Sequence, residues 1–127
     1  MKTNKIDKIT ARKIIADYAD AWITQDPEKI ARLFTPDGVY HEYVLEKPYI
    51  GHEAIKRYWN DRIIAEENEI KFVLLNVYIE NNTVIAEWEA TFLYEGKPTL
   101  MREVAIMEIV KGKIKSLREY WHSKTLL

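Results

Sequence analysis

The sequence predicts an α+β domain, with helices in its first half and a curled antiparallel sheet in its second half. Up to Ile63, apolar residues recur at spacings of three, four and five, as on one face of a helix. From Ile70 onward the spacing changes to two, as in strands that bury one face. Only short turns separate these strands, so they should pair as antiparallel neighbours in a meander. Helices followed by such a meander define the α+β class.

Composition indicates one globular domain that spans residues 1–127 and has enough chain to bury a core. A net charge of −1 offers no basic field for nucleic acid or an anionic membrane surface. With no cysteine, the chain has no disulfide, thiolate metal site or cysteine nucleophile. The charged N-terminus contains no signal peptide pattern, and no stretch is apolar enough to span a membrane. We therefore expect a cytoplasmic protein.

Three helices are expected, and each has a local signal. The first presents one apolar face made of nine residues: Ile6, Ile9, Ala11, Ile14, Ile15, Tyr18, Ala19, Trp22 and Ile23. The second begins with Asp26 as N-cap and Pro27 at the first helical position, and the turn "TPDG" at 35–38 ends it. The third opens after Gly51 and should bury four residues: Ile55, Tyr58, Trp59 and Ile63.

Four strands are expected at 70–80, 83–95, 99–110 and 113–123. The second of them has a clear inward face: Ala86, Trp88, Ala90, Phe92 and Tyr94. The third is apolar on both faces. Since the helices can cover only one face of the sheet, we expect a homodimer packed through the other. Either face of the last strand could point inward.

The stretch "GVYHEYVL" at 38–45 reads like a strand, yet it carries Glu42 in its middle. Val39, His41, Tyr43 and Leu45 form one face, and the other face holds Tyr40, Glu42 and Val44. By hydrophobicity alone, the face with Val39 is slightly the better core face, which would put Glu42 in solvent. Periodicity alone therefore leaves open whether Glu42 faces water or a pocket.

The segment "YADAWITQDPEKIARLFTPDGVYHEYVLEKPYIGHEAIKRYW" resembles the SnoaL-like polyketide cyclases and ketosteroid isomerases of the nuclear transport factor 2-like fold. The shared features are the aromatic first helix, the Asp26-Pro27 start, the pattern LF-x-x-DG-x-Y-x-(acid), the pattern G-x-EAI-x-x-(aromatic) and a closing "LREYW". The resemblance covers nearly the whole chain as a single SnoaL-like domain. It implies a cystatin-like arrangement, in which three helices pack on a strongly curved sheet and leave a cone-shaped pocket.

The resemblance also implies roles for particular residues. Glu42 falls where the isomerases keep the carboxylate that moves the proton, and Tyr18 falls where they keep the oxyanion-binding tyrosine. Their second oxyanion donor aligns with Ala105, so half of that site is missing here. The cyclases place an acid on the last strand, which makes Glu119 a candidate second acid. The residues expected to line the pocket and bind substrate are Trp22, Tyr40, Trp59, Trp88, Phe92, Glu103, Ala105, Met107, Leu117, Glu119 and Trp121.

Each of these residues could instead have a purely structural role. Glu42 could be a solvated strand residue and Tyr18 a core aromatic. Glu103 and Glu119 could join Glu42 as acids, but structural ion pairs with Arg102 or Arg118 are the favoured interpretation. The histidines at 41, 52 and 122 lack metal-binding spacing, so no metal site is expected.

The resulting hypothesis is an enzyme without cofactor or metal that binds a small, apolar, carbonyl-type ligand. Glu42 would move a proton next to the carbonyl, and Tyr18 would donate to the developing oxyanion, in an isomerase, cyclase or dehydratase reaction. The alternative is a non-catalytic ligand-binding or dimerisation module. Glu42 at the floor of an open pocket within reach of Tyr18 would favour the enzyme. A cavity filled by Trp22, Trp59, Trp88 and Trp121 would favour the module.

Overall fold

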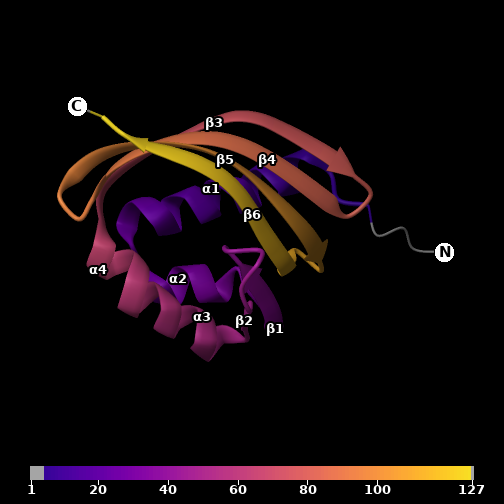
Figure 1. Cartoon of the computed structure of the whole chain (residues 1–127). Coiled ribbons are helices and arrows are strands. Elements are labelled where there is room, and N and C mark those ends of the chain that lie inside the picture. Colours follow the sequence, from indigo (N-terminus) through magenta and orange to yellow (C-terminus); the bar gives the residue numbers. More distant parts are fainter. Residues whose placement is uncertain (1–4, 127) are drawn as a thin grey trace.

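The computed structural model describes residues 5–126 and shows the expected order of helices followed by a long sheet. The elements are α1 (Lys8–Thr24), α2 (Pro27–Arg32), β1 (Phe34–His41), β2 (Tyr49–Ile50), α3 (His52–Tyr58), the π-helix η1 (Trp59–Ile63), α4 (Ile64–Glu66), β3 (Glu67–Glu80), β4 (Thr83–Tyr94), β5 (Lys97–Val110) and β6 (Lys113–Thr125). Strands β3 to β6 curve over α1, and the other helices lie on the same side of the sheet (Figure 1). The predicted α+β class is confirmed. No helix in the described range is long and apolar enough to cross a membrane.

The six strands form one sheet in the order β2-β1-β6-β5-β4-β3. The predicted antiparallel meander of β3 to β6 is confirmed. One pair differs from the prediction, because β1 runs parallel to β6, with Tyr40 opposite Leu117, so the sheet is mixed. The predicted turn at 35–38 lies within β1, where the register shifts between Phe34 and Val39. Such a bulge accommodates Pro36, which cannot donate to a sheet ladder.

Helix α1 buries a narrower face than the sequence predicted. Ile14, Ile15 and Tyr18 are in the core, but Ile9 is 83% exposed and Ile23 is 49% exposed. Each of these two residues lies five positions from a core residue, and five residues turn a helix by about 140°. Their inclusion in the buried face was therefore wrong. The narrow face directs Tyr18 toward the sheet.

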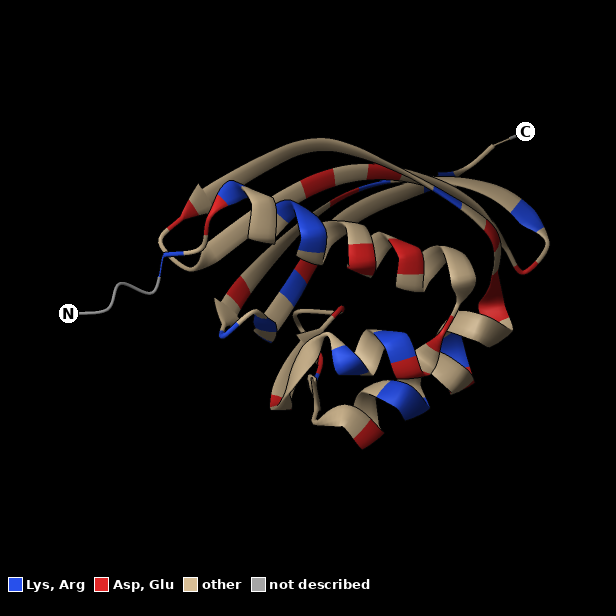
Figure 2. Cartoon of the chain, turned by 180° about the vertical axis from the view of Figure 1, so that it is seen from behind, with Lys and Arg blue, Asp and Glu red and all other residues tan. Residues whose placement is uncertain are grey.

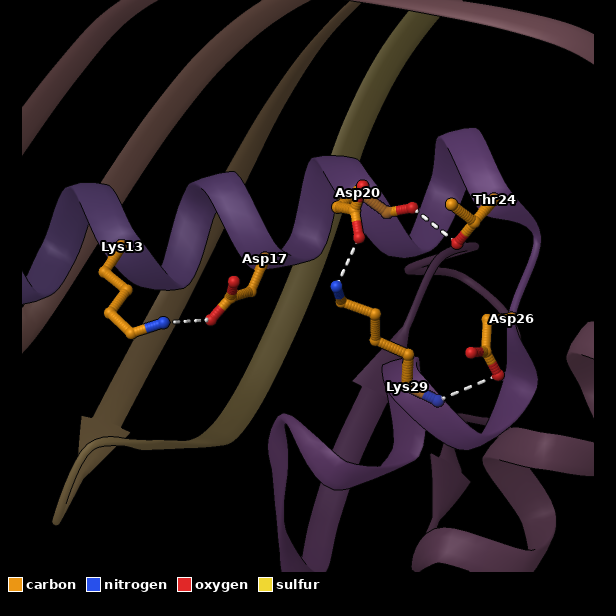
Figure 3. A network of polar contacts seen from close by, with 6 residues as sticks. All are labelled: Lys13, Asp17, Asp20, Thr24, Asp26 and Lys29. Carbon is orange, nitrogen blue, oxygen red and sulfur yellow. Dashed lines mark hydrogen bonds and ion pairs between the residues drawn. The ribbon is translucent and has the colours of Figure 1, made fainter.

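The junction between α1 and α2 is held by caps and surface charges. The Asp26 side chain accepts hydrogen bonds from the backbone N–H groups of Glu28 and Lys29, which confirms it as the N-cap. The Lys29 ammonium contacts Asp20 on α1, and the Thr24 hydroxyl donates to the Asp20 carbonyl at 2.7 Å (Figure 3). The contact between Lys29 and Asp20 joins the second helix to the end of the first, and β1 starts two residues after α2.

The third helical segment runs without a break from α3 through η1 to α4. All four residues predicted to be buried on it are in the core: Ile55, Tyr58, Trp59 and Ile63. On β4 the predicted inward face is confirmed from Ala86 to Phe92, whereas Tyr94 at the strand end is 38% exposed. On β6, Leu117 and Glu119 point inward. On β1, Tyr40 is buried, and Glu42 just beyond the strand is buried on the same side.

Gly38 provides a test of the β1 bulge. A methyl group added there would lie 2.8 Å from Cβ of the buried Phe34 and 3.0 Å from the Thr35 carbonyl oxygen. Since these neighbours are a packed ring and backbone, we expect Gly38→Ala to lower the free energy of unfolding by about 1–3 kcal/mol in urea titrations. Gly96→Ala is the control, because nothing lies near its added methyl group and only the positive φ of 81° opposes it. A Gly38→Ala protein as stable as the wild type would contradict the close packing described here.

Candidate functional site

The concave side of the sheet encloses a narrow inner cavity of about 30 Å³, which holds about two water molecules. Its lining comprises Trp22, Glu42, Glu67, Ile70, Phe72, Trp88, Ala90, Phe92, Met101, Glu103 and Trp121. An outer groove of about 330 Å³ adjoins it, and five residues line both spaces: Glu42, Glu67, Phe92, Met101 and Trp121. The outer groove thus leads into a smaller inner cavity that is lined by aromatic and acidic side chains.

The structure separates the predicted lining residues into three groups. Trp22, Trp88, Phe92, Glu103 and Trp121 line the inner cavity as expected. Glu119 lines a groove of about 430 Å³ beside residues 43–46. Five others are buried in the core behind the inner cavity: Tyr40, Trp59, Ala105, Met107 and Leu117. These five residues were expected to contact the ligand because they lie on the inner side of the fold. In the structure, the aromatic core fills most of the space on that side.

Several residues that line the inner cavity were not predicted from the sequence. Phe72 stacks on Trp88 with ring centroids 5.0 Å apart, and Ile70 lies on the same strand. Their alternation in the sequence could have placed them on the inner face. Glu67 is different, because it lies where α4 passes into β3, and no pattern in the sequence marks that junction.

Glu42 is buried, with only 8% of its surface exposed, and it lies where the inner cavity meets the outer groove. The Tyr58 hydroxyl donates to its Oε2 at 2.6 Å, and the Tyr40 hydroxyl donates to its Oε1 at 3.2 Å. Burial, followed by the charge of Glu119, raises the pKa of Glu42 to about 8, although both tyrosine bonds favour the ionised form. The pocket-facing orientation suggested by the resemblance is correct.

Glu103 and Glu119 form a second acidic pair. Glu119 lies opposite Ala105 and Glu103 opposite Trp121, so the two acids are diagonal neighbours on the inner face of β5 and β6. Burial raises the pKa of both carboxyls, and the hydrogen bond between them favours a proton on Glu103. Oε2 of Glu103 and Oε1 of Glu119 have no other donor within the described residues. One proton shared by the two carboxyls is consistent with this arrangement.

The favoured interpretation of Glu103 and Glu119 as structural ion pairs is wrong. Arg102 points to the outer face of the sheet, where it contacts Glu89 at 2.6 Å and Glu87 at 3.8 Å. Arg102 and Glu103 are adjacent on one strand, so their side chains leave on opposite faces. The same alternation separates Arg118 from Glu119.

Tyr18 contacts Glu119 instead of Glu42. Its hydroxyl donates to Oε2 of Glu119, and the whole residue is buried behind the cavity. Both oxygens of Glu42 are already occupied by Tyr58 and Tyr40. The expected direct pairing of Tyr18 with Glu42 is therefore absent from this structure, and Tyr18 instead fixes the Glu103–Glu119 pair.

The charge around the inner cavity is entirely acidic. Basic residues occur on the helices and the sheet (Figure 2), but none is among the described residues that line it. Burial raises the pKa of Glu67 to about 7, with the charge of Glu119 as the next cause. No group of three His, Cys, Asp or Glu residues between 5 and 126 is arranged to hold a metal ion. His41 and His52 instead contact the backbone carbonyl oxygens of Glu46 and Phe34.

The profile of the SnoaL-like domain matches residues 15–117, and the chain therefore belongs to the SnoaL-like domain family. No curated protein matches it. Among solved structures, it is similar to a hypothetical protein from Catenulispora acidiphila with a ketosteroid isomerase-like fold in complex with trimethylamine. That match has 22% identity and a TM-score of 0.77, and it covers 85% of this chain and 84% of the other.

Two further structures show the same fold. One is SalBIII, described as an epoxide hydrolase/cyclase-like enzyme in pyran ring formation in the polyether salinomycin, with 18% identity, a TM-score of 0.80 and coverage of 94% and 98%. The other is an NTF-2 like protein of unknown function from Burkholderia xenovorans, with 18% identity, a TM-score of 0.70 and coverage of 90% and 84%. The predicted family and fold are thus confirmed.

The buried acids should make stability depend on pH. Between the unfolded pKa of 4.5 and the folded value of about 8, the native state binds more protons at Glu42 than the unfolded chain does. The free energy of unfolding should therefore fall as pH rises through this window, by up to about 1.4 kcal/mol per pH unit for each extra proton. Urea titrations from pH 5 to 9 measure this slope. Glu42→Gln should make this slope less steep, and the exposed control Glu80→Gln should leave it unchanged. Equal slopes in the wild type and both variants would refute the raised pKa of Glu42.

Proposed function

We propose that the protein is a cofactor-independent enzyme that moves a proton in a small, mostly apolar molecule, with Glu42 as the general acid/base. The observation that carries this proposal is the position of Glu42, a buried carboxyl at the junction of the inner cavity and the outer groove. It has two tyrosine donors and no basic partner. The reaction class is proton transfer next to a carbonyl, as in isomerisation, aldol-type cyclisation or dehydration.

The ionisation of Glu42 fits either direction of transfer. With a pKa of about 8, about a tenth of the protein carries ionised Glu42 at pH 7. The protonated form can give a proton to a leaving hydroxyl or a carbonyl, and the ionised form can remove one from carbon. Tyr58 and Tyr40 hold both oxygens and thereby fix the direction in which the carboxyl points.

Tyr18 receives a different role from the one first expected. Its hydroxyl is bound to Glu119 and it does not line the inner cavity. We therefore assign it a positioning role, in which it orients Glu119 and, through the shared proton, Glu103. The cyclase-like and isomerase-like neighbours support the reaction class only through the shared fold.

The competing function is ligand binding without chemistry. The observation that favours it is the small inner cavity of about 30 Å³, next to which Trp22 packs on Trp59 with ring centroids 4.6 Å apart. A binding module would keep its affinity when Glu42 becomes glutamine and would show no turnover in either form.

Hydrogen–deuterium exchange at carbon separates these functions without knowledge of the natural substrate. A panel of enolisable ketones is incubated with the protein in D₂O, and exchange next to the carbonyl is followed by proton NMR. We expect Glu42→Gln to slow the catalysed exchange at least 100-fold and Glu80→Gln to leave it unchanged. The wild-type rate should rise with pH and level off near the Glu42 pKa of about 8, because the ionised form is the base. Undiminished exchange in Glu42→Gln, with circular dichroism showing an intact fold, would remove Glu42 from the mechanism.

We further propose that the protein is a homodimer packed through the outer face of the sheet. Tyr78, Ile85, Val104, Ile106 and Tyr120 lie on this face, and none of them is fully buried in the single chain. Sedimentation should give twice the 15.1 kDa mass of the chain, and Ile106→Asp should give the single mass by placing a charge in the apolar interface. Glu80→Gln at the strand end is the control. A monomeric wild type would refute the dimer.

A further inference from the structure

The inner cavity combines an aromatic lining with a set of carboxyl groups. Its aromatic lining consists of Trp22, Phe72, Trp88, Phe92 and Trp121. Between these rings lie three carboxyl groups, those of Glu42, Glu67 and Glu103. All three lose hydration there, since burial is the largest cause of the raised pKa in each. A purely apolar ligand would leave these groups without compensation.

Glu103 is the acid whose environment points most directly to a ligand. Only 5% of its surface is exposed, it lines the inner cavity, and its Oε2 has no hydrogen-bond donor within the described residues unless Glu119 provides a proton. Unlike Glu42, it receives no tyrosine hydroxyl. A proton shared with Glu119 can neutralise this pair in the empty cavity, and a cation brought from outside would favour the ionised carboxyl and displace that proton.

The lining also indicates which kind of positive charge fits. Aromatic rings attract organic cations through their quadrupole and at the same time bury methyl groups, so they favour alkylated ammonium over a hydrated metal ion. No cluster suited to a metal occurs among the described residues. An anion would be repelled by the carboxyls, and the lining offers it no lysine, arginine or histidine.

We propose that the inner cavity, together with the space where it meets the outer groove, binds the alkylated ammonium head group of the substrate, while the carbonyl-bearing remainder of the molecule lies in the outer groove. Glu42 and Glu67 line both spaces, so Glu42 would then face the carbon atoms between the charged head and the carbonyl. This inference names the substrate class and rests on the proposed function for its catalytic meaning. Lys124 lies in the outer groove and not in the inner cavity, which leaves the cavity as the favourable place for the cation.

Cation binding should be linked to proton release. The titratable groups around the cavity come from every packed element: Tyr18 from α1, Tyr40 from β1, Glu42 after β1, Tyr58 from α3, Glu67 at the start of β3, Glu103 from β5 and Glu119 from β6. The cation lowers the pKa of the carboxyls that it contacts, so a proton leaves as it binds. Affinity should therefore rise from pH 6 to 8, by up to about tenfold per pH unit for one released proton.

The test compares two molecules of the same shape that differ in charge. Choline carries a trimethylammonium head, and 3,3-dimethyl-1-butanol is its neutral carbon isostere. Their affinities are measured by isothermal titration calorimetry, and tryptophan fluorescence reports entry because Trp22, Trp88 and Trp121 line the cavity. We expect choline to bind at least tenfold more tightly than the isostere at pH 8, and only choline to show the pH dependence. Equal affinities, or a choline affinity that is independent of pH, would overturn the proposal.

Variants locate the binding. Glu103→Gln should weaken choline binding at least tenfold and leave the isostere unaffected. Glu89→Gln, on the outer face of the neighbouring strand, should change neither affinity. If Glu103→Gln does not fold, Glu67→Gln at the rim of the cavity is the second variant, with the same expected direction. Choline binding that ignores both substitutions would also overturn the proposal.

The two proposals fail in different ways. If choline and its isostere bind equally while Glu42→Gln abolishes ketone exchange, the ammonium site is refuted and the acid–base function stands. If choline binds selectively while Glu42→Gln leaves exchange unchanged, the ammonium site stands and the acid–base function is refuted.

Discussion

The burial of several carboxyl groups without a basic partner is the constraint on which the remaining structure depends. Each carboxyl removed from water must gain a donor, share a proton or take one up. Tyr58 and Tyr40 donate hydrogen bonds to Glu42, and Tyr18 donates one to Glu119. Glu103 and Glu119 share a proton. The tyrosines in turn must be held in place, and α1, β1 and α3 each contribute one. The helices therefore position hydroxyl groups as well as covering the sheet.

The mixed sheet brings the two acidic groups together. Because β1 pairs parallel to β6, Tyr40 lies opposite Leu117, and the chain leaves β1 with Glu42 on the side that carries Glu119. The charge of Glu119 accordingly contributes to the raised pKa of Glu42. A hairpin could not bring Glu42 and Glu119 together in this way, because it joins consecutive strands, and β1 and β6 come from opposite halves of the chain.

The sequence predicted those parts of the fold that depend on local patterns. The β3–β6 meander follows from alternation and short turns, and the start of α2 follows from Asp26 and Pro27. The parallel β1–β6 pair has no local signal, because the pairing joins residues more than 70 positions apart, such as Tyr40 and Leu117. The direction of Glu42 came only from the family resemblance, since hydrophobicity alone slightly favoured burial of the opposite face of its segment. The ion-pair interpretation of Glu103 failed for a reason visible in the sequence, because neighbouring strand residues such as Arg102 and Glu103 cannot share a face.

The π-helix η1 has a consequence for how the site can vary among relatives. Its wider turn contains one residue more than an α-helical turn, and it lies directly before α4 and Glu67. A single deletion at Trp59–Ile63 would restore ordinary α-helical geometry and leave the later residues of the segment facing as they do now, because the wide turn absorbs its extra residue locally. The same deletion in a regular α-helical turn would rotate every later residue by about 100°. Glu67 at the rim of the cavity would keep its direction in the first case and would point elsewhere in the second, although its identity had not changed. Alignments that close this one-residue gap will equate positions that do not share a side-chain direction, and the acidic character of the cavity is thus a property of helix phase as well as of residue type.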